Sequence, residues 1–511
     1  MSSEGKMKRT WLICMFIILP LIMTYGYSNI TITKFITMGL VVITGFYSFI
    51  TLWYVNWVKN GKKNFLNKLC VTDYLVIAFL VVNIITCLLS VNPGYSFIAQ
   101  NDKKTGLFFV ILLFFVYVTI RFEYWHDNEI TIWRKCVPAA GLILVISFAL
   151  FQFMGLDIGL LLGRLMKEER NNFLSTLGNT AVFGKFICII GIVSAYEFLG
   201  EFSSKIEQVI LTVSMILLPM GIMASNTDAT FLGFLIGAYL LLCVSVREGK
   251  LIRYIKCISL QLVGILLFDI IYTLSPGKRV ISNIGRTLVN LWPVEIIILV
   301  LLLIMILLVL KTDKSSSGMS SDNKKTEQLR RKISHLMIYF AVIVSIIAVG
   351  LLVYFSTAGC NVNLGYMERY LRFNDSWGTE RGYVWKWIVE IYSEASFKDK
   401  LFGFGQGMVP VVLMQNFENT MKSQLGYLFD NAHNVYLHQM ISIGLVGLLA
   451  YLSVIISSIV SGMRSNKTYG YTIALIAVIV MDVVSIYEPI TTPYVWTLIG
   501  IIISISNKRC N

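Results

Sequence analysis

Apolar residues form long runs along this chain, and short charged segments separate them. Many runs approach the roughly 20 residues that an α-helix needs to cross a bilayer. A soluble α/β enzyme would instead show apolar runs of about 4 to 8 residues between amphipathic helices. The pattern predicts an all-α, polytopic membrane protein with about 12 to 14 transmembrane helices. The expected spans are 11–28, 35–58, 71–90, 105–120, 137–156, 180–199, 208–225, 229–246, 254–274, 291–310, 336–356, 434–460, 470–487 and 491–506.

Composition supports this interpretation, because 56% of the 511 residues are hydrophobic, only 14% are charged, and the mean hydropathy is +0.72. The net charge of +14 raises the alternative of a nucleic-acid partner. However, the expected spans place 26 of the 43 Lys and Arg residues in segments on one side of the membrane. The positive-inside rule makes that side cytoplasmic, so we expect both termini in the cytoplasm and no nucleic-acid partner.

The run that begins at Trp11 follows basic residues and lacks a small-residue cleavage site, and further spans come after it. We therefore expect it to be a first transmembrane helix and not a signal peptide.

Two polar segments interrupt the helical pattern. Residues 311–332 are rich in Ser and Lys, which predicts a flexible cytoplasmic linker, within 311–335, between transmembrane blocks 1–310 and 336–511. Residues 357–433 carry aromatic residues, glycines and charges of both signs, which is typical of an ordered loop. The topology places this second segment, the cap, on the outer side.

The sequence RGYVWKWIVEIYSEAS inside the cap predicts an amphipathic helix that lies at the membrane surface. Its aromatic face has two interpretations, an interfacial anchor or part of a functional site. GFGQG at 403–407 predicts a tight turn, and because no strand precedes it we do not interpret it as a dinucleotide-binding motif.

The histidines at the end of the cap are the first candidates for chemistry. His433 and His438 are five residues apart, which on a helix separates them by roughly 140° and disfavours a zinc pair. Asn431 and Asn434 are expected to cap the following helix, and Asp430 is positioned to orient the imidazole of His433. A purely structural interfacial histidine is the alternative.

Basic residues cluster upstream in the cap, and guanidinium forks match phosphate oxygens in pairs. Such a cluster beside a lipid surface suits a lipid-linked diphosphate. Its members are Arg369, Arg372, Arg381 and Lys386.

Charged residues within or beside the spans are a third signal, since each costs roughly 2.5 to 3.5 kcal/mol at a helix centre unless it is paired or hydrated. Lys185 and Asp228 both fall in the outer half of the membrane. We expect Lys185 either to pair with Asp228 or to contact a ligand phosphate. For Asp269, Glu295 and Asp482 the sequence suggests no partner.

These features occur in a recognisable order. A Gly-Asn pair before a middle helix, the hairpin SNTDAT, RGYVWKW and LFGFGQG in the cap, NAHNVYLHQMISIGLVGLLAYL, and EPITTPYVWTLIGI resemble the O-antigen ligase and O-antigen polymerase family of bacterial membrane glycosyltransferases. The resemblance is closest over residues 357–460, weaker over 171–240 and absent in detail before 150.

The resemblance implies a GT-C-like helical fold in the bacterial cytoplasmic membrane. It also implies transfer of a glycan from an undecaprenyl-diphosphate-linked oligosaccharide to an acceptor hydroxyl on the outer face, without a nucleotide sugar, cofactor or metal. The family's histidine falls on His433, which would activate or orient the acceptor, and its loop arginine falls on Arg381, which would hold the donor diphosphate. Arg372 is a second candidate contact.

This chain departs from the family at the hairpin, where Asp228 stands in place of an arginine and Lys185 is the candidate substitute. The implied partners are the lipid-linked donor, a glycan or other hydroxyl acceptor, membrane lipid and other proteins of envelope polysaccharide assembly.

Two other classes of function remain open at this stage. A flippase or exporter of lipid-linked sugars also has many helices and buried charges, although the chain shows no internal repeat of the kind common in transporters. A scaffold of an envelope assembly complex would leave the cluster of His433 and Arg381 unexplained. Polymerase and ligase share donor and chemistry, and these residues do not separate them.

Overall fold

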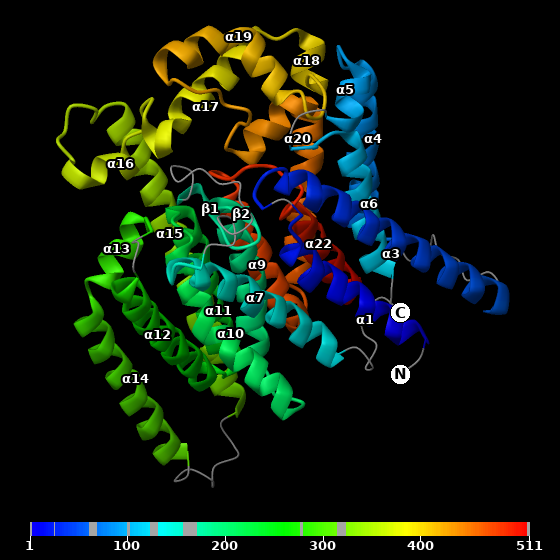
Figure 1. Cartoon of the computed structure of the whole chain (residues 1–511). Helices are drawn as coiled ribbons and strands as arrows, with labels where there is room; N and C mark the ends of the chain where they lie inside the picture. Colours follow the sequence, from blue (N-terminus) through cyan, green and yellow to red (C-terminus); the bar gives the residue numbers. More distant parts are fainter. Residues whose placement is uncertain are drawn as a thin grey trace.

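The computed structural model describes residues 3–24, 26–60, 69–99, 103–122, 131–156, 171–275, 279–313 and 323–507, and they form a helical protein (Figure 1). Within these ranges nine helices are long and apolar enough to cross a membrane, which supports a multi-pass membrane protein. They are α3 (Ile30–Asn60), α4 (Val71–Leu89), α7 (Thr131–Phe153), α9 (Thr180–Phe198), α10 (Lys205–Ala224), α11 (Asp228–Glu248), α12 (Leu251–Leu274), α15 (Asn323–Ser356) and α20 (Val435–Gly462).

A bent pair of helices, α13 (Asn283–Val289) and α14 (Trp292–Asp313), makes a tenth candidate span with an angle of 71° between its two parts. Three further expected spans are apolar helices of fewer than 18 residues. They are α6 (Leu107–Phe122), α21 (Tyr469–Met481) with the 3-10 turn η6 (Asn466–Thr468) before it, and α22 (Thr492–Ser506). The all-α class is confirmed, and within the described ranges fewer helices reach full transmembrane length than the expected 12 to 14.

The first expected span, 11–28, is shorter in the structure. The chain forms α1 (Ser3–Ile13), a π-helical turn η1 (Cys14–Ile18) and α2 (Leu19–Leu21), and the helix ends there. The buried ammonium of Lys34 on α3 donates to the carbonyls of Leu19 at 2.8 Å and Pro20 at 2.7 Å. A side chain from the next helix thus satisfies the carbonyls at the early helix end.

The N-terminal and C-terminal blocks share one hydrophobic core. Helix α4 packs on α20, α6 on α22 and α9 on α21, and the main apolar cluster contains residues from Trp11 to Ile505. The segment 311–335 therefore does not separate two independently packed units. Its second part, from Asn323, is already helical in α15, and residues 314–322 lie outside the described ranges.

A short hairpin precedes α9, with strand β1 (Phe173–Leu174) antiparallel to β2 (Gly178–Asn179). Phe173 pairs with Asn179, and Leu174 pairs with Gly178. The side chain of Asn179 then accepts the N–H of Ala181 at 2.8 Å and caps α9.

The cap is ordered, as expected, and forms a layer of short helices above the bundle (Figure 1). It has its own apolar cluster, separate from the main core. Its elements are η5 (Gly365–Met367), α16 (Glu368–Leu371), α17 (Trp377–Glu394), α18 (Phe397–Phe402) and α19 (Val409–Gln424).

The amphipathic helix of the cap does not place its apolar face on lipid. Val384, Trp387 and Ile388 on α17 are buried in the cap's own cluster. Trp387 stacks on Phe417 of α19 with ring centroids 5.3 Å apart. The expectation of a helix at the membrane surface is corrected, because α19 covers the face that a membrane would otherwise cover.

The turn at 403–407 fixes the cap to the transmembrane helices. Helix α20 is broken at Gly444, with φ 67° and ψ −172°, and the break exposes backbone groups just before it. The N–H groups of Phe404 and Gly405 donate to the carbonyls of Ile441 and Ser442, each at 2.9 Å. A Cβ on Gly403 would lie 2.4 Å from the backbone of Ser442, so only glycine permits this approach. The expected tight turn is confirmed as a docking element.

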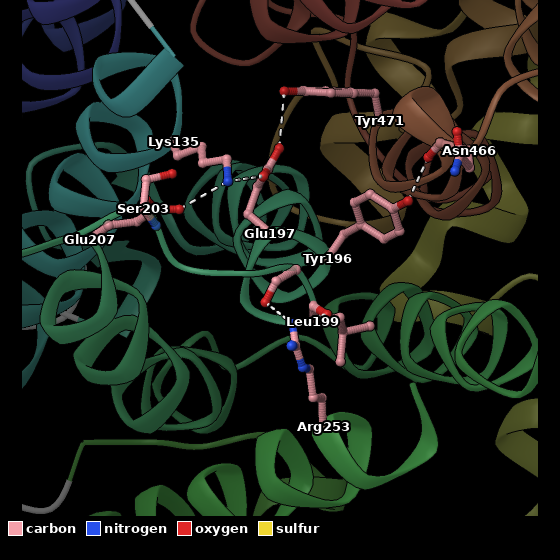
Figure 2. Close-up of polar contacts among 10 residues, drawn as sticks. Lys135, Tyr196, Glu197, Leu199, Ser203, Glu207, Arg253, Asn466 and Tyr471 are labelled. Carbon is pink, nitrogen blue, oxygen red and sulfur yellow. Dashed lines mark hydrogen bonds and ion pairs between the residues drawn. The ribbon is translucent and has the colours of Figure 1, made fainter. Parts of the chain in front are cut away.

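Polar residues join the end of α9 to the starts of α7 and α10 (Figure 2). Lys135 at the start of α7 contacts Glu197 at 3.4 Å and Glu207 at 2.9 Å. The hydroxyl of Tyr196 donates to the carbonyl of Asn466, which follows the far end of α20. These residues lie in or next to the loops that the expected topology places on one side of the membrane. The contacts between them are consistent with that order of spans.

Candidate functional site

The candidate site begins at the entrance to α20, where the chain passes from the cap into the bundle. Asn434 is the N-cap, and its side chain accepts the N–H groups of Tyr436 at 2.9 Å and Leu437 at 3.0 Å. The side chain of Asn431 accepts the N–H of His433 at 3.0 Å. Both asparagines therefore cap backbone groups as the sequence predicts.

His433 occupies a strained position between these two caps. Its φ of 49° is in the left-handed region, which costs of order 1–3 kcal/mol in a non-glycine residue and is enriched at functional sites. Its imidazole lies edge-on to Phe429, with ring centroids 5.5 Å apart. Burial, followed by the positive charges of Arg381 and Lys103, lowers the pKa of His433 to about 3. The imidazole is neutral at neutral pH.

Arg381 enters the site from α17 after an unusual turn. Gly378, Thr379 and Glu380 all have positive φ, between 62° and 66°, and the regular helix begins after them. Thr379 and Glu380 are strained there, as His433 is. Glu380, the acid beside Arg381 in sequence, accepts the hydroxyl of Tyr427, and burial followed by this contact raises the pKa of Tyr427 to about 12.

The guanidinium of Arg381 is partly buried, and within the described ranges it forms no ion pair. One of its terminal nitrogens donates to the carbonyl of Gly378 at 3.0 Å, while its Nε is buried without a partner. Burial lowers the pKa of Arg381 below its ordinary value, and the group remains a cation at neutral pH. A buried cation without a carboxylate is unfavourable alone and favours an anion.

Lys103 is a site residue that the sequence did not single out. It lies in the loop between α5 (Pro93–Ile98) and α6, and its ammonium is 3.5 Å from a carboxylate oxygen of Asp430. Asp430 was expected to orient the imidazole of His433. Among the residues that the structure describes its carboxylate instead pairs with Lys103.

Arg372, the second expected diphosphate contact, is used by the cap itself. Its guanidinium pairs with Glu368 at 2.5 Å and donates to the carbonyls of Phe355, at 3.4 Å, and Val362. These contacts fasten α16 to the end of α15. Each of the three guanidinium nitrogens already has an acceptor within the protein, which disfavours the diphosphate role that stays a prediction for Arg372.

Lys185 and Asp228 do not pair with each other. Lys185 forms a buried ion pair with Asp482 at 2.5 Å, which supplies the partner that the sequence did not indicate. One carboxylate oxygen of Asp228 accepts the hydroxyl of Tyr370 at 3.0 Å and links the start of α11 to the cap. The expected pair with Asp228 is therefore wrong, and the ion pair with Asp482 disfavours the phosphate contact, which stays a prediction.

Two of the flagged intramembrane acids remain unpaired in the described chain. All four carboxylate oxygens of Asp269 on α12 and Glu295 on α14 are buried without a hydrogen-bond donor. His438 is also buried, and its ring lies 5.4 Å from that of Tyr487, so it packs in the core of the bundle. Within the described ranges no group of three or more His, Cys, Asp or Glu residues is arranged to hold a metal ion.

The described residues thus combine a neutral imidazole, an arginine without a carboxylate and a second cation, Lys103, whose charge acts on the imidazole. Such a set can bind an anionic group and place it beside a proton acceptor. In comparisons with known proteins, no protein-family model matches the chain, and no curated protein matches it.

Proposed function

We propose that this protein transfers a glycan from an undecaprenyl-diphosphate-linked oligosaccharide to an acceptor hydroxyl at the outer face of the bacterial cytoplasmic membrane. The observation that carries the proposal is the juxtaposition of neutral His433 with the positive charges of Arg381 and Lys103, where Arg381 has no carboxylate partner among the described residues. A diphosphate beside Arg381 would supply the anion that this arginine lacks, and the positive charge of Lys103 would add to the attraction.

In the proposed reaction the acceptor oxygen attacks the anomeric carbon of the donor sugar. The hydroxyl proton moves to an imidazole nitrogen of His433 as the new bond between carbon and oxygen forms. The bond from the anomeric carbon to the diphosphate oxygen breaks, and the lipid diphosphate leaves with the electron pair. Arg381 and Lys103 stabilise the charge that develops on this oxygen, so no metal is required in the step.

A histidine with a pKa of about 3 is a weak base, which at first argues against His433 as the proton acceptor. Part of the lowering comes from the charges of Arg381 and Lys103. A bound diphosphate neutralises these charges, so the pKa of His433 rises when the donor is present. The imidazole therefore becomes a stronger base in the complex with donor than in the free protein.

The proposal is tested with purified protein in lipid nanodiscs and a defined lipid-diphosphate-linked oligosaccharide. Release of lipid diphosphate is measured, and the products are separated by size. A ladder of products indicates a polymerase, and a single addition to another acceptor indicates a ligase. If no lipid diphosphate is released with any acceptor, the protein is not a transferase of this class.

The second candidate function, a flippase or exporter, is favoured by one observation. Asp269 and Glu295 are buried within candidate membrane-spanning helices without hydrogen-bond donors among the described residues. Unpaired acids at such positions often mark ion or proton pathways in transporters. Asp269→Asn and Glu295→Gln together should abolish glycan movement across the membrane in a transporter, whereas the transferase proposal expects lipid-diphosphate release to continue.

A further inference from the structure

The buried ion pair of Lys185 and Asp482 lies directly beneath the candidate site. Lys185 is in the second turn of α9, and Asp482 follows the last residue of α21. Their side chains are 2.5 Å apart, and each residue is only 3% exposed. The other nearby acid, Glu488, has its carboxylate occupied by the N–H groups of Ile490 and Thr491. Asp482 is thus the specific partner of Lys185.

The backbone of Asp482 holds the first residue of α20. Its carbonyl accepts the N–H of Val435 at 2.9 Å, a group that the side chain of Asn434 leaves unsatisfied. One turn earlier in α21, the carbonyl of Ile479 accepts the hydroxyl of Tyr436 at 2.7 Å. The entrance of α20 is therefore fixed by the end of α21 in addition to its own cap.

His433 is two residues before this anchor, and its conformation depends on it. A residue at φ 49° persists only where its surroundings determine the backbone on both sides. Asn431 supplies one side of that constraint, and the junction of Val435 with Asp482 supplies the other. A shift of the end of α21 would move this junction and with it the imidazole.

We infer that the ion pair of Lys185 and Asp482 is a positioning pair that holds His433 in its desolvated place beside Arg381, so that Lys185 acts through the helix entrance and not on the substrate. The expected effect on the transfer rate rests on the proposed function. The expected effect on the surroundings of His433 does not depend on what the protein transfers.

Removal of the ammonium leaves the carboxylate of Asp482 buried without its partner, which destabilises the end of α21. We expect Lys185→Met to expose His433 to solvent and to weaken the influence of Arg381 and Lys103 on it. His433 should then titrate near its ordinary pKa of about 6.5. Transfer should fall by roughly tenfold or more, because a misplaced base loses its geometry.

The experiment uses full-length protein labelled with ¹⁵N-histidine in nanodiscs. The chain has only four histidines, and His433→Asn identifies the signal of interest. In the wild type this signal should not titrate between pH 5 and 8, whereas in Lys185→Met it should titrate near pH 6.5. Lys185→Arg, which keeps the cation, should retain the wild-type behaviour.

The charge-swapped variant Lys185→Asp with Asp482→Lys separates the two roles of Lys185. A positioning pair is restored by the swap, so the non-titrating signal and most of the transfer rate should return. If Lys185 instead binds the donor phosphate, the swap will not restore the transfer rate. The inference would be overturned if the folded swap variant fails to recover transfer and the His433 signal of Lys185→Met titrates as in the wild type. Absence of transfer in the wild type would refute the proposed function, while the titration would still decide the positioning role.

Discussion

Arg372 and Arg381 are two arginines of one cap that differ in what surrounds them. Arg372 has a carboxylate at 2.5 Å and two carbonyl acceptors. Arg381 has one carbonyl acceptor, a buried Nε without a partner and no ion pair among the described residues. The neighbouring acid Glu380 accepts a hydrogen bond from Tyr427 and forms no ion pair with Arg381 among the described residues.

The difference shows how the same residue type serves architecture in one place and recognition in another. A guanidinium whose donors are all matched stabilises the fold and has little left for a ligand. A partly buried guanidinium without a counter-charge gains most from an incoming anion. Lys185 belongs with Arg372 in this respect, because Asp482 already neutralises it.

The largest expected effect is on Arg381. Arg381→Gln should reduce the rate of lipid-diphosphate release by roughly 100- to 1,000-fold, the range for loss of one group that stabilises the developing charge. Arg381→Lys keeps the positive charge but lacks the two-pronged guanidinium. Its rate of lipid-diphosphate release should lie between the rates of Arg381→Gln and the wild type. Rates per folded protein are measured in nanodiscs with a defined donor. A wild-type rate in Arg381→Gln would refute the assignment.

A smaller effect is expected at Lys103. Its pairing with Asp430 already offsets part of its charge, so Lys103→Gln should weaken donor binding by about tenfold, or about 1.4 kcal/mol. The KM for the lipid-linked donor reports this change. Asp430→Asn is the matched variant, and it should leave donor binding unchanged or strengthen it because Lys103 is released. Equal losses in both variants would show that the pair has a structural role only.

Arg372→Ala should leave transfer within about twofold of the wild type while it destabilises the cap. Loss of its charge-assisted hydrogen bonds should lower the free energy of unfolding by roughly 1 to 2 kcal/mol. Thermal unfolding in nanodiscs and the transfer rate are measured on the same preparation. A large loss of rate without a loss of stability would return Arg372 to the diphosphate site.

The smallest effect concerns acid stability. The pKa of His433 is about 3 in the folded protein, below its ordinary value of about 6.5. Between these values the unfolded state binds the proton and the folded state does not, so stability falls as the pH drops below about 6.5. His433→Asn tolerates the left-handed backbone and cannot titrate. Its melting temperature should therefore decline less from pH 7 to pH 5, and parallel declines would contradict the burial of His433.

Local features of the fold were predictable from the sequence, whereas long-range contacts were not. The span 180–199 agrees with α9, and the cap at Asn434 and the turn at 403–407 follow from neighbouring residues. The early end of the first helix depends on Lys34, and the break at Gly444 occurs where the turn at 403–407 docks on α20. Hydrophobic periodicity carries no information on either contact.

The site was predictable in part for the same reason. His433 and Arg381 stand in a distinctive order of motifs, but Lys185 and Asp482 are 297 residues apart, and nothing in the sequence links them. Lys103 offered one signal, since it belongs to a pair of lysines in a loop expected on the outer side, where basic residues are depleted.

The central claim is that an anionic diphosphate binds between Arg381 and Lys103 beside His433. The most direct measurement is the titration of ¹⁵N-labelled His433 with and without a short-chain isoprenyl diphosphate. Binding should neutralise the two cations and raise the pKa of His433 by at least about one unit, and Arg381→Gln should abolish most of the rise while Arg372→Ala leaves it intact. A saturating diphosphate that leaves the titration of His433 unchanged would contradict the account.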